Sequence, residues 1–210
     1  MELAVLVVIA GSMVGCGVVE YLVYAFSPES KGALVAAECE ALTENKRVLV
    51  LVYADESMQY RSGGLARYNT SAAVGKELEE RLRVDVVDAS SVEYFQVNNL
   101  RWRDEHPSTA GQRFAADFVL YIELQEYTTQ AEESGELLRG RMKGTAVLYG
   151  AAGAEGGSVP QLWRGSARAE YPPNVPEVAD MANEQAIRFR TLGLFAEDLV
   201  KHFYNHREQG

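Results

Sequence analysis

A continuous apolar run, Val48-Leu49-Val50-Leu51-Val52-Tyr53, follows the basic pair Lys46-Arg47 and decides the fold. Its residues are β-branched or large and apolar at consecutive positions, which is the pattern of a strand buried on both faces. A strand of this kind lies inside a sheet that is covered by helices. The run therefore predicts a central strand of an α/β domain.

The residues that follow predict a β-α-β unit. Asn69-Thr70-Ser71 offers a helix N-cap, because amide and hydroxyl side chains accept hydrogen bonds from the first turn of a helix. Val74, Leu78 and Leu82 then recur at helical spacing. Residues 84–87 predict the next short strand, which would pair in parallel with the first through a right-handed crossover.

The second half of the chain has the pattern of an antiparallel sheet. Apolar and polar residues alternate over 118–125, which is typical of a strand with one better buried face. Residues 138–149 and 162–171 predict two further strands, joined as a hairpin by the glycine-rich stretch 151–158. Apolar residues over 181–203 recur at a spacing of about 3.6 residues and predict a long C-terminal helix. The predicted fold class is mixed α/β: one mixed sheet with a β-α-β start, an antiparallel hairpin, and the C-terminal helix packed on the sheet.

The N-terminus predicts export and lipidation. The apolar run Leu3 to Ala10 leads into Gly11-Ser12-Met13-Val14-Gly15-Cys16, and small residues before a cysteine are the pattern that a lipoprotein signal peptidase recognises. We expect residues 1–15 to be a signal peptide, residues 16–45 the lipid anchor and linker, with the lipid on Cys16, and residues 46–206 a single domain. The alternative is an uncleaved membrane-spanning anchor, because the apolar stretch from Leu3 to Val19 approaches the about 20 residues that a spanning helix needs.

Both alternatives place the rest of the chain in the cell envelope, anchored to a membrane and facing the periplasm. Gly17 follows the cysteine where an Asp would retain a lipoprotein at the inner membrane of some bacteria, which favours the outer membrane. The formal charge of −10 would repel phosphate-rich partners, so we expect no nucleic acid partner. Cys39 lies between Glu38 and Glu40, which disfavour its thiolate. It is predicted to be an incidental linker cysteine, with an intermolecular disulfide as the alternative.

Three acidic residues form the candidate ligand site. Asp55 and Glu56 directly follow the first predicted strand, and Asp88 follows the second. Ligands of open α/β sheets bind outside the carboxyl ends of the strands, where these oxygens could hold a cation or a polar ligand. The alternative is that they are turn and cap residues, a role that Asp favours.

A group of aromatic residues forms the candidate partner surface. Its members lie in predicted loops or short helices between the first strands: Tyr60, Tyr68, Tyr94, Phe95 and Trp102. Exposed aromatic side chains are enriched where proteins meet partners. The alternative is that they cover the sheet edge as part of the core.

Catalytic motifs are missing from the sequence. There is no Gly-x-Ser-x-Gly elbow, and Ser62-Gly63-Gly64 stands too far before the predicted helix to be a phosphate-binding loop. His202 and His206 would lie one turn apart on the last helix, but no third metal ligand is evident, so solvated histidines are expected. We therefore expect no enzyme activity, no metal and no cofactor.

Four segments carry a resemblance to a family. These are Gly15-Cys16, the run from Lys46 to Tyr53, the stretch 114–121 and Leu162-Trp163-Arg164-Gly165. Together they resemble the envelope-assembly lipoproteins, a loose group that includes the curli secretion component, the penicillin-binding-protein activator lipoprotein and the amino-terminal domain of the Tol translocation protein. The similarity spans about residues 46–205, and Ala116-Asp117-Phe118-Val119-Leu120 matches the group's Ala-Asp-Tyr-Val-Leu strand with Phe for Tyr. The chain looks most similar to bacterial lipoproteins of no assigned activity that carry Tyr53-Ala54-Asp55-Glu56.

The resemblance implies a mixed sheet with packed helices that serves as a binding module in the periplasm. We therefore expect a membrane-anchored lipoprotein that acts as a non-catalytic binding or accessory module in cell-envelope assembly or transport, with another envelope protein as partner. The alternative function is a periplasmic domain that binds a small ligand or cation through Asp55, Glu56 and Asp88.

Overall fold

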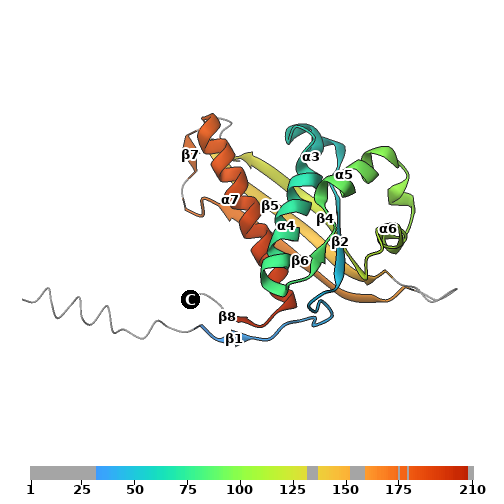
Figure 1. The fold of residues 1–210 in the computed structure, drawn as a ribbon. Coiled ribbons are helices and arrows are strands. Elements are labelled where there is room, and N and C mark those ends of the chain that lie inside the picture. The colour runs from blue at the N-terminus through green and yellow to red at the C-terminus, as the bar shows by residue number, and fades with distance from the viewer. Residues whose placement is uncertain (1–31, 132–136, 152–158, 175, 179, 208–210) are drawn as a thin grey trace, which may run out of the picture. The chain divides into compact units, whose positions relative to one another are not determined.

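A computed structural model describes residues 32–131, 137–151, 159–174, 176–178 and 180–207 of the chain (Figure 1). The predicted signal peptide and Cys16 lie outside these residues. Within the part that is described, no helix is both long enough and apolar enough to cross a membrane.

A six-stranded mixed sheet forms the centre of the fold. Its strands are β2 (Arg47–Tyr53), β3 (Asp85–Val86), β4 (Phe118–Gln130), β5 (Leu137–Gly150), β6 (Gln161–Tyr171) and β7 (Glu177–Val178). The order is β3-β2-β4-β5-β6, and β7 pairs with β5. Strand β2 is parallel to both of its neighbours, whereas β4, β5 and β6 are antiparallel. The predicted mixed α/β class, the parallel start and the hairpin are confirmed.

Helices connect and cover the strands. They are α3 (Glu56–Arg61), α4 (Ala66–Leu82), α5 (Ala89–Asn98), α6 (Pro107–Arg113) and α7 (Met181–Val200), with short 3₁₀ turns η1 (Trp102–Asp104) and η2 (Lys201–Phe203). Two further short strands, β1 (Leu34–Val35) and β8 (His206–Arg207), pair with each other.

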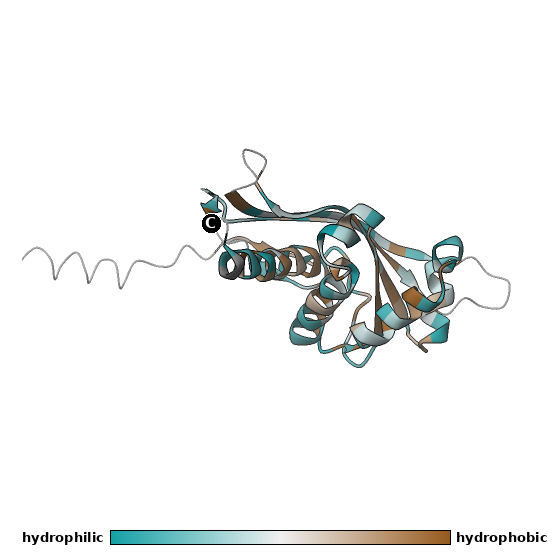
Figure 2. Cartoon of the chain, turned by 90° about the horizontal axis from the view of Figure 1, so that it is seen from above, coloured by the Kyte–Doolittle hydropathy of each residue, from teal (hydrophilic) through white to brown (hydrophobic). Residues whose placement is uncertain are grey.

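Strand β2 is buried on both faces, as its sequence predicts. Residues 48–52 are at most 1% exposed. Val50 belongs to one apolar cluster together with residues of α4 and α7, and Leu49 belongs to a second cluster together with residues of α5, η1 and α6. The sheet therefore lies between two helical layers, and Figure 2 shows the hydrophobic residues concentrated along its strands.

The long C-terminal helix is confirmed as α7. Asp180 caps its start, because the Asp180 side chain accepts a hydrogen bond from the Asn183 backbone at 2.8 Å. Ile187, Phe195 and Leu199 are each at most 1% exposed and face the sheet. Helix α7 packs beside α4 and against β5 and β6 (Figure 1).

Helix α4 begins earlier than the sequence pattern indicates. It starts at Ala66, so Asn69-Thr70-Ser71 lies inside the helix instead of capping it. The Ser71 hydroxyl donates to the Val50 carbonyl of β2 at 3.0 Å. Two side chains that precede α4 accept hydrogen bonds from its first turn: the Ser62 hydroxyl from the Ala66 N–H at 3.0 Å and the Gln59 amide oxygen from the Arg67 N–H at 3.3 Å.

The stretch predicted to be a linker up to residue 45 is part of the domain from residue 36 onwards. The Glu38 backbone N–H donates to the His202 carbonyl at 2.8 Å, and the Ala37 N–H donates to the Asn205 side chain at 2.9 Å. Leu42 is 3% exposed and belongs to the core. These contacts join residues that are far apart in the sequence, so local composition could not indicate them.

The two C-terminal histidines do not share a helix. His202 lies in η2 and His206 lies in β8. The His202 Nδ1 atom is 2.9 Å from a Glu38 carboxylate oxygen, and its ring lies beside that of Trp163. The expectation of solvated histidines on a helix face is wrong for His202, because α7 ends at Val200 and the chain turns onto residues 37–39.

Candidate functional site

The three acidic residues of the candidate ligand site follow parallel strands. Asp55 comes after β2 and Asp88 after β3, and these two strands pair in parallel. Each aspartate is the N-cap of a helix. The Asp55 carboxylate accepts from the Met58 N–H at 2.7 Å and from the Ser57 hydroxyl at 2.8 Å. The Asp88 carboxylate accepts from the Ser91 N–H at 3.0 Å and from the Ser90 hydroxyl.

These hydrogen bonds stabilise the ionised carboxylates. The Met58 backbone N–H, followed by the Ser57 hydroxyl, lowers the pKa of Asp55. The Ser90 hydroxyl, followed by the Ser91 backbone N–H, lowers the pKa of Asp88. Both carboxylates are therefore charged at neutral pH and are already bonded to their own helices, which is the geometry of the cap alternative.

The ligand site remains a prediction. Glu56 is exposed in the first turn of α3, where a negative charge is favourable near the helix start. Asp88 lines a hollow of about 280 Å³ together with Tyr68, between α4 and the start of α5, but Asp55 and Glu56 are not among its lining residues. Within the described part of the chain, no group of three or more His, Cys, Asp or Glu side chains is arranged to hold a metal ion.

The five predicted partner-surface aromatics separate into two groups. Tyr60 and Tyr94 are 88% and 73% exposed, and Tyr68 is 37% exposed. Phe95 and Trp102 are 8% and 7% exposed and belong to the apolar cluster on the α5 side of the sheet. For these two residues the surface prediction is wrong, because the inward face of α5 and the η1 turn direct them onto the sheet.

The exposed aromatics lie in the same stretch of sequence as other exposed apolar side chains. Among the residues that the structure describes, ten large hydrophobic side chains are exposed, and six of them lie between residues 60 and 100. We call these six the α3–α5 surface: Tyr60, Leu65, Tyr68, Tyr94, Val97 and Leu100. They lie on or directly beside α3, α4 and α5, and α4 contacts both other helices; exposed apolar residues on neighbouring elements favour an interaction site.

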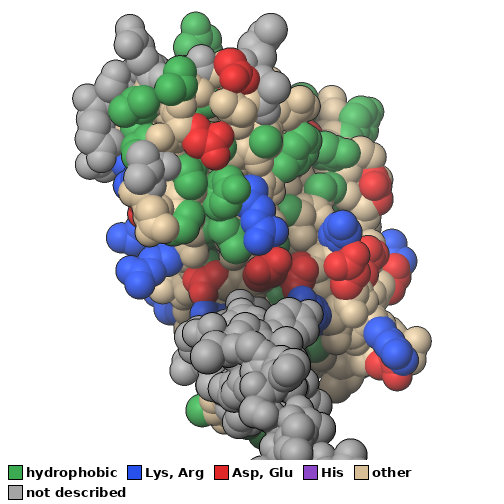
Figure 3. All heavy atoms as spheres, turned by 90° about the vertical axis from the view of Figure 1, so that its left-hand side faces the viewer, with side chains coloured by type: hydrophobic (Ala, Val, Ile, Leu, Met, Phe, Trp, Pro, Cys, Tyr) green, Lys and Arg blue, Asp and Glu red, His purple; other side chains and the backbone are tan. Residues whose placement is uncertain are grey.

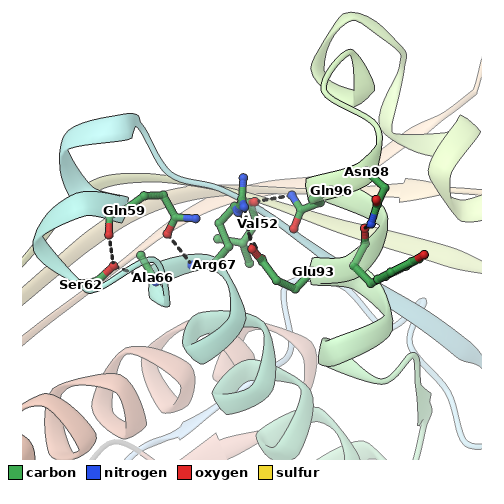
Figure 4. Close-up of polar contacts among 9 residues, drawn as sticks. Val52, Gln59, Ser62, Ala66, Arg67, Glu93, Gln96 and Asn98 are labelled. Atoms are coloured by element: carbon green, nitrogen blue, oxygen red, sulfur yellow. Dashed lines mark hydrogen bonds and ion pairs between the residues drawn. The ribbon is translucent and has the colours of Figure 1, made fainter.

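Polar contacts hold α3, α4 and α5 together (Figure 4). Arg67 of α4 donates two hydrogen bonds to the Glu93 carboxylate of α5, at 2.6 and 3.2 Å, and both side chains are about four-fifths buried. The Gln59 side chain of α3 accepts from the Arg67 N–H at 3.3 Å. Gln96 of α5 donates to the Val52 carbonyl of β2 at 2.8 Å. The three helices are thus fixed to one another and to the sheet.

Sequence reasoning missed the residues of this network. Arg67 and Glu93 are 26 positions apart; Arg67 precedes the helix start that the sequence predicts at residues 69–71, and Glu93 alone has the pattern of a solvent-exposed helix residue. The one available signal is Gln96, a polar residue four positions after Val92 on the inward face of α5, which indicates a buried side chain that needs a partner.

A second apolar feature lies between α4 and α7. This groove of about 510 Å³ is lined by small and apolar residues, among them Tyr68, Ala72 and Phe189, and also by four charged residues, Lys76, Glu77, Glu80 and Glu197. Figure 3 shows the molecule from the left-hand side of Figure 1, the side on which α7 and β7 lie. Hydrophobic side chains gather in the upper part of this face, and acidic and basic side chains mix below them.

No protein-family model matches the chain, and no curated protein sequence matches it. The fold is similar to that of the PelC dodecamer from Paraburkholderia phytofirmans, at 10% identity over 83% of this chain and 100% of that chain, with a TM-score of 0.43. It is also similar to lipoprotein GNA1162 from Neisseria meningitidis, at 20% identity over 72% of this chain and 99% of that chain, with a TM-score of 0.41. A third similar structure is the hypothetical protein CT253 from Chlamydia trachomatis, at 11% identity over 77% of this chain and 94% of that chain, with a TM-score of 0.42.

Proposed function

We propose that the chain is a membrane-anchored lipoprotein that acts as a non-catalytic binding or accessory module in cell-envelope assembly or transport. The observation that carries the proposal is the α3–α5 surface, which exposes Tyr60 and Tyr94 on helices that hydrogen bonds fix to one another. Aromatic side chains provide most of the binding energy at many protein interfaces. A rigid support reduces the entropy that is lost when such a surface binds its partner.

The proposed anchor is a lipid on Cys16, which would hold the domain at a membrane and facing the periplasm, with the outer membrane favoured by Gly17. The intact mass of the native protein, extracted in detergent, tests this part of the proposal beside a Cys16→Ser variant. We expect a chain that begins at residue 16 and carries acyl mass, and we expect the variant to lack both features. A chain that still begins at Met1 without added mass would contradict lipidation and favour a membrane-spanning anchor.

The docking role is tested by affinity capture from detergent-solubilised envelopes. We compare the natural chain with a Tyr60→Ser, Tyr94→Ser double variant and with Val178→Ser, a control that changes an exposed apolar residue on β7. Loss of an aromatic hot spot weakens an interface by about tenfold or more. We expect one envelope protein to be depleted with the double variant and retained with the control. Equal recovery with all three chains would contradict docking through the α3–α5 surface.

A further inference from the structure

A cavity of about 210 Å³ lies where the end of β4 meets α3 and α7. Polar and charged residues dominate its lining, namely Arg61, Tyr127, Thr129, Gln130, Glu184 and Arg188. This volume exceeds by several times the about 30 Å³ that one water molecule occupies in the liquid. It is below the about 300 Å³ at which drug-sized pockets begin, so it fits a single small group.

A β-bulge directs Tyr127 toward this cavity. Strand β4 pairs Leu124 with Gly144 and Glu126 with Lys143, so one extra residue stands in β4 at this point. The extra residue reverses which side chains of β4 point to each face of the sheet. Tyr127 therefore joins Leu124 in the core cluster on the α4 and α7 side. Bulges of this kind redirect side chains and are enriched beside functional sites.

Two hydrogen-bond donors at the cavity have no acceptor among the described residues. Tyr127 is 6% exposed, and its buried hydroxyl has no acceptor among the described residues, although the Asn69 side chain interacts with the phenolic oxygen. The Nε atom of Arg188 is likewise buried and unbonded. Burial raises the pKa of Tyr127, although the nearby Asn69 amide and Arg188 guanidinium oppose the rise, so the phenol stays protonated and able to donate. Buried donors without partners are rare in folded proteins because each one costs free energy.

The charge at the cavity is positive. Arg61 and Arg188 bring two guanidinium groups, and Glu184 brings one carboxylate. That carboxylate is already engaged, because it accepts from Arg188 Nη2 at 2.7 Å and from the Thr129 hydroxyl at 3.2 Å. The net positive charge of this cluster is opposite in sign to the formal charge of the whole chain, which is −10.

We propose that this cavity binds an oxyanion, the phosphate or carboxylate group of a small ligand. The Tyr127 hydroxyl and Arg188 Nε would donate hydrogen bonds to its oxygens, and the Arg61 guanidinium would add a second positive charge. Arginine and protonated hydroxyl groups are the donors that recognise such groups in proteins. The proposal is independent of the α3–α5 surface, since it uses other residues.

Calorimetric titration of the full chain in neutral detergent tests the site, with inorganic phosphate and with acetate as probes and with ionic strength held constant by chloride. We expect Arg188→Gln to weaken binding of the tighter probe by about tenfold or more. Tyr127→Phe should weaken it by about threefold or more, yet leave the melting temperature without ligand nearly unchanged, because the removed hydroxyl has no acceptor for its proton. Arg190→Gln, which removes an exposed charge two positions away on α7, is the matched control and should change affinity by less than about twofold.

Two results would overturn the proposal. One is the absence of measurable heat with either probe, which would mean that the cavity holds water alone. The other is binding that Arg190→Gln weakens as much as Arg188→Gln does, which would mean a general attraction to surface charge. If binding is found, glycerophosphoglycerol, the soluble headgroup of phosphatidylglycerol, distinguishes the source. Tighter binding than that of inorganic phosphate points to a lipid headgroup, and weaker binding points to a free anion.

Discussion

Single aspartates begin several helices and strands of this fold, and their effects are local. Asp55 and Asp88 cap α3 and α5, and Asp180 caps α7. Asp117 connects two strands, because its carboxylate accepts from the Arg47 N–H at 2.8 Å at the start of β2. The Ala116-Asp117 pair before β4 therefore has a structural role, which is to align the starts of two parallel strands.

We predict that Asp88→Ala destabilises the fold by about 1 kcal/mol, because α5 loses its cap, and that Asp88→Ser retains most of the stability. The pKa of Asp88 is lowered in the folded chain. The contribution of Asp88 to the free energy of unfolding is therefore complete above pH 3.8, the pKa of an unfolded Asp, and it is lost as the pH falls through the lowered pKa. Urea unfolding at neutral pH and at successively lower pH measures the difference. If the stability difference between Asp88→Ala and the natural chain stayed constant into strong acid, the ionised Asp88 carboxylate would not be the cap.

For single residues, the sequence shows which positions are candidates for a special role, but it does not decide between the roles. The strand-end aspartates are recognisable, and cap residues are one of two roles that their positions allow. The local pattern predicts that Thr70 and Ser71 begin a helix, but both are buried within α4, where tertiary contacts with the sheet override the local capping preference. Trp102 could not be assigned to the core without knowing how η1 turns onto the sheet.

At the scale of elements, the close packing of α7 on β5 depends on Gly140. A Cβ atom at Gly140 would overlap the Thr191 hydroxyl and lie 3.0 Å from Ile187 Cγ2. Gly193, on α7 itself, has no atom within 4 Å of the position that a Cβ would take. These two glycines therefore form a matched pair for testing the contact between helix and sheet.

We predict that Gly140→Ala destabilises the fold by about 1 to 3 kcal/mol, because α7 must move away from β5 or strain its side chains. Gly193→Ala should be neutral or stabilising by up to about 1 kcal/mol, since alanine favours the helix. Chemical denaturation of both variants measures this. Equal stability of the two variants would show that α7 does not approach β5 as closely as described.

Periodicity predicts the elements well where it is regular and fails where a local irregularity enters. The alternation over 118–125 predicts β4 as far as Leu124, and the bulge then reverses which residues face the helices. Tyr127 and Thr129 are therefore placed by an irregularity that no pattern of apolar residues indicates. The cavity at the end of β4 could not be predicted from the sequence for this reason.

At the scale of the whole molecule, residues from both ends of the described domain meet at Glu38. One Glu38 oxygen accepts from the Trp163 indole at 2.9 Å, and the other lies 2.9 Å from His202 Nδ1. The Trp163 hydrogen bond is the main cause that lowers the pKa of Glu38, and His202 contributes further. This contact therefore holds the segment around Glu38 against β6 and η2.

We predict that Glu38→Ala destabilises the fold by about 1 to 2 kcal/mol at neutral pH, because the 7% exposed Trp163 loses the acceptor for its indole N–H. The matched control Glu40→Ala, an exposed neighbour, should have little effect. The stabilisation should disappear as the pH falls through the lowered pKa of Glu38. Thermal unfolding followed by tryptophan fluorescence measures this, and an effect of Glu40→Ala equal to that of Glu38→Ala would contradict it.

The proposed docking role is a property of the whole molecule in its envelope, and photo-cross-linking in living cells tests it most directly. A photoreactive amino acid replaces Tyr60, Tyr94 or, as the control, Val178 in otherwise natural chains. The account predicts adducts from positions 60 and 94 with the same envelope protein, and no such adduct from position 178. Absence of adducts from both tyrosine positions, or an equal adduct from position 178, would contradict the claim that the α3–α5 surface is the docking site.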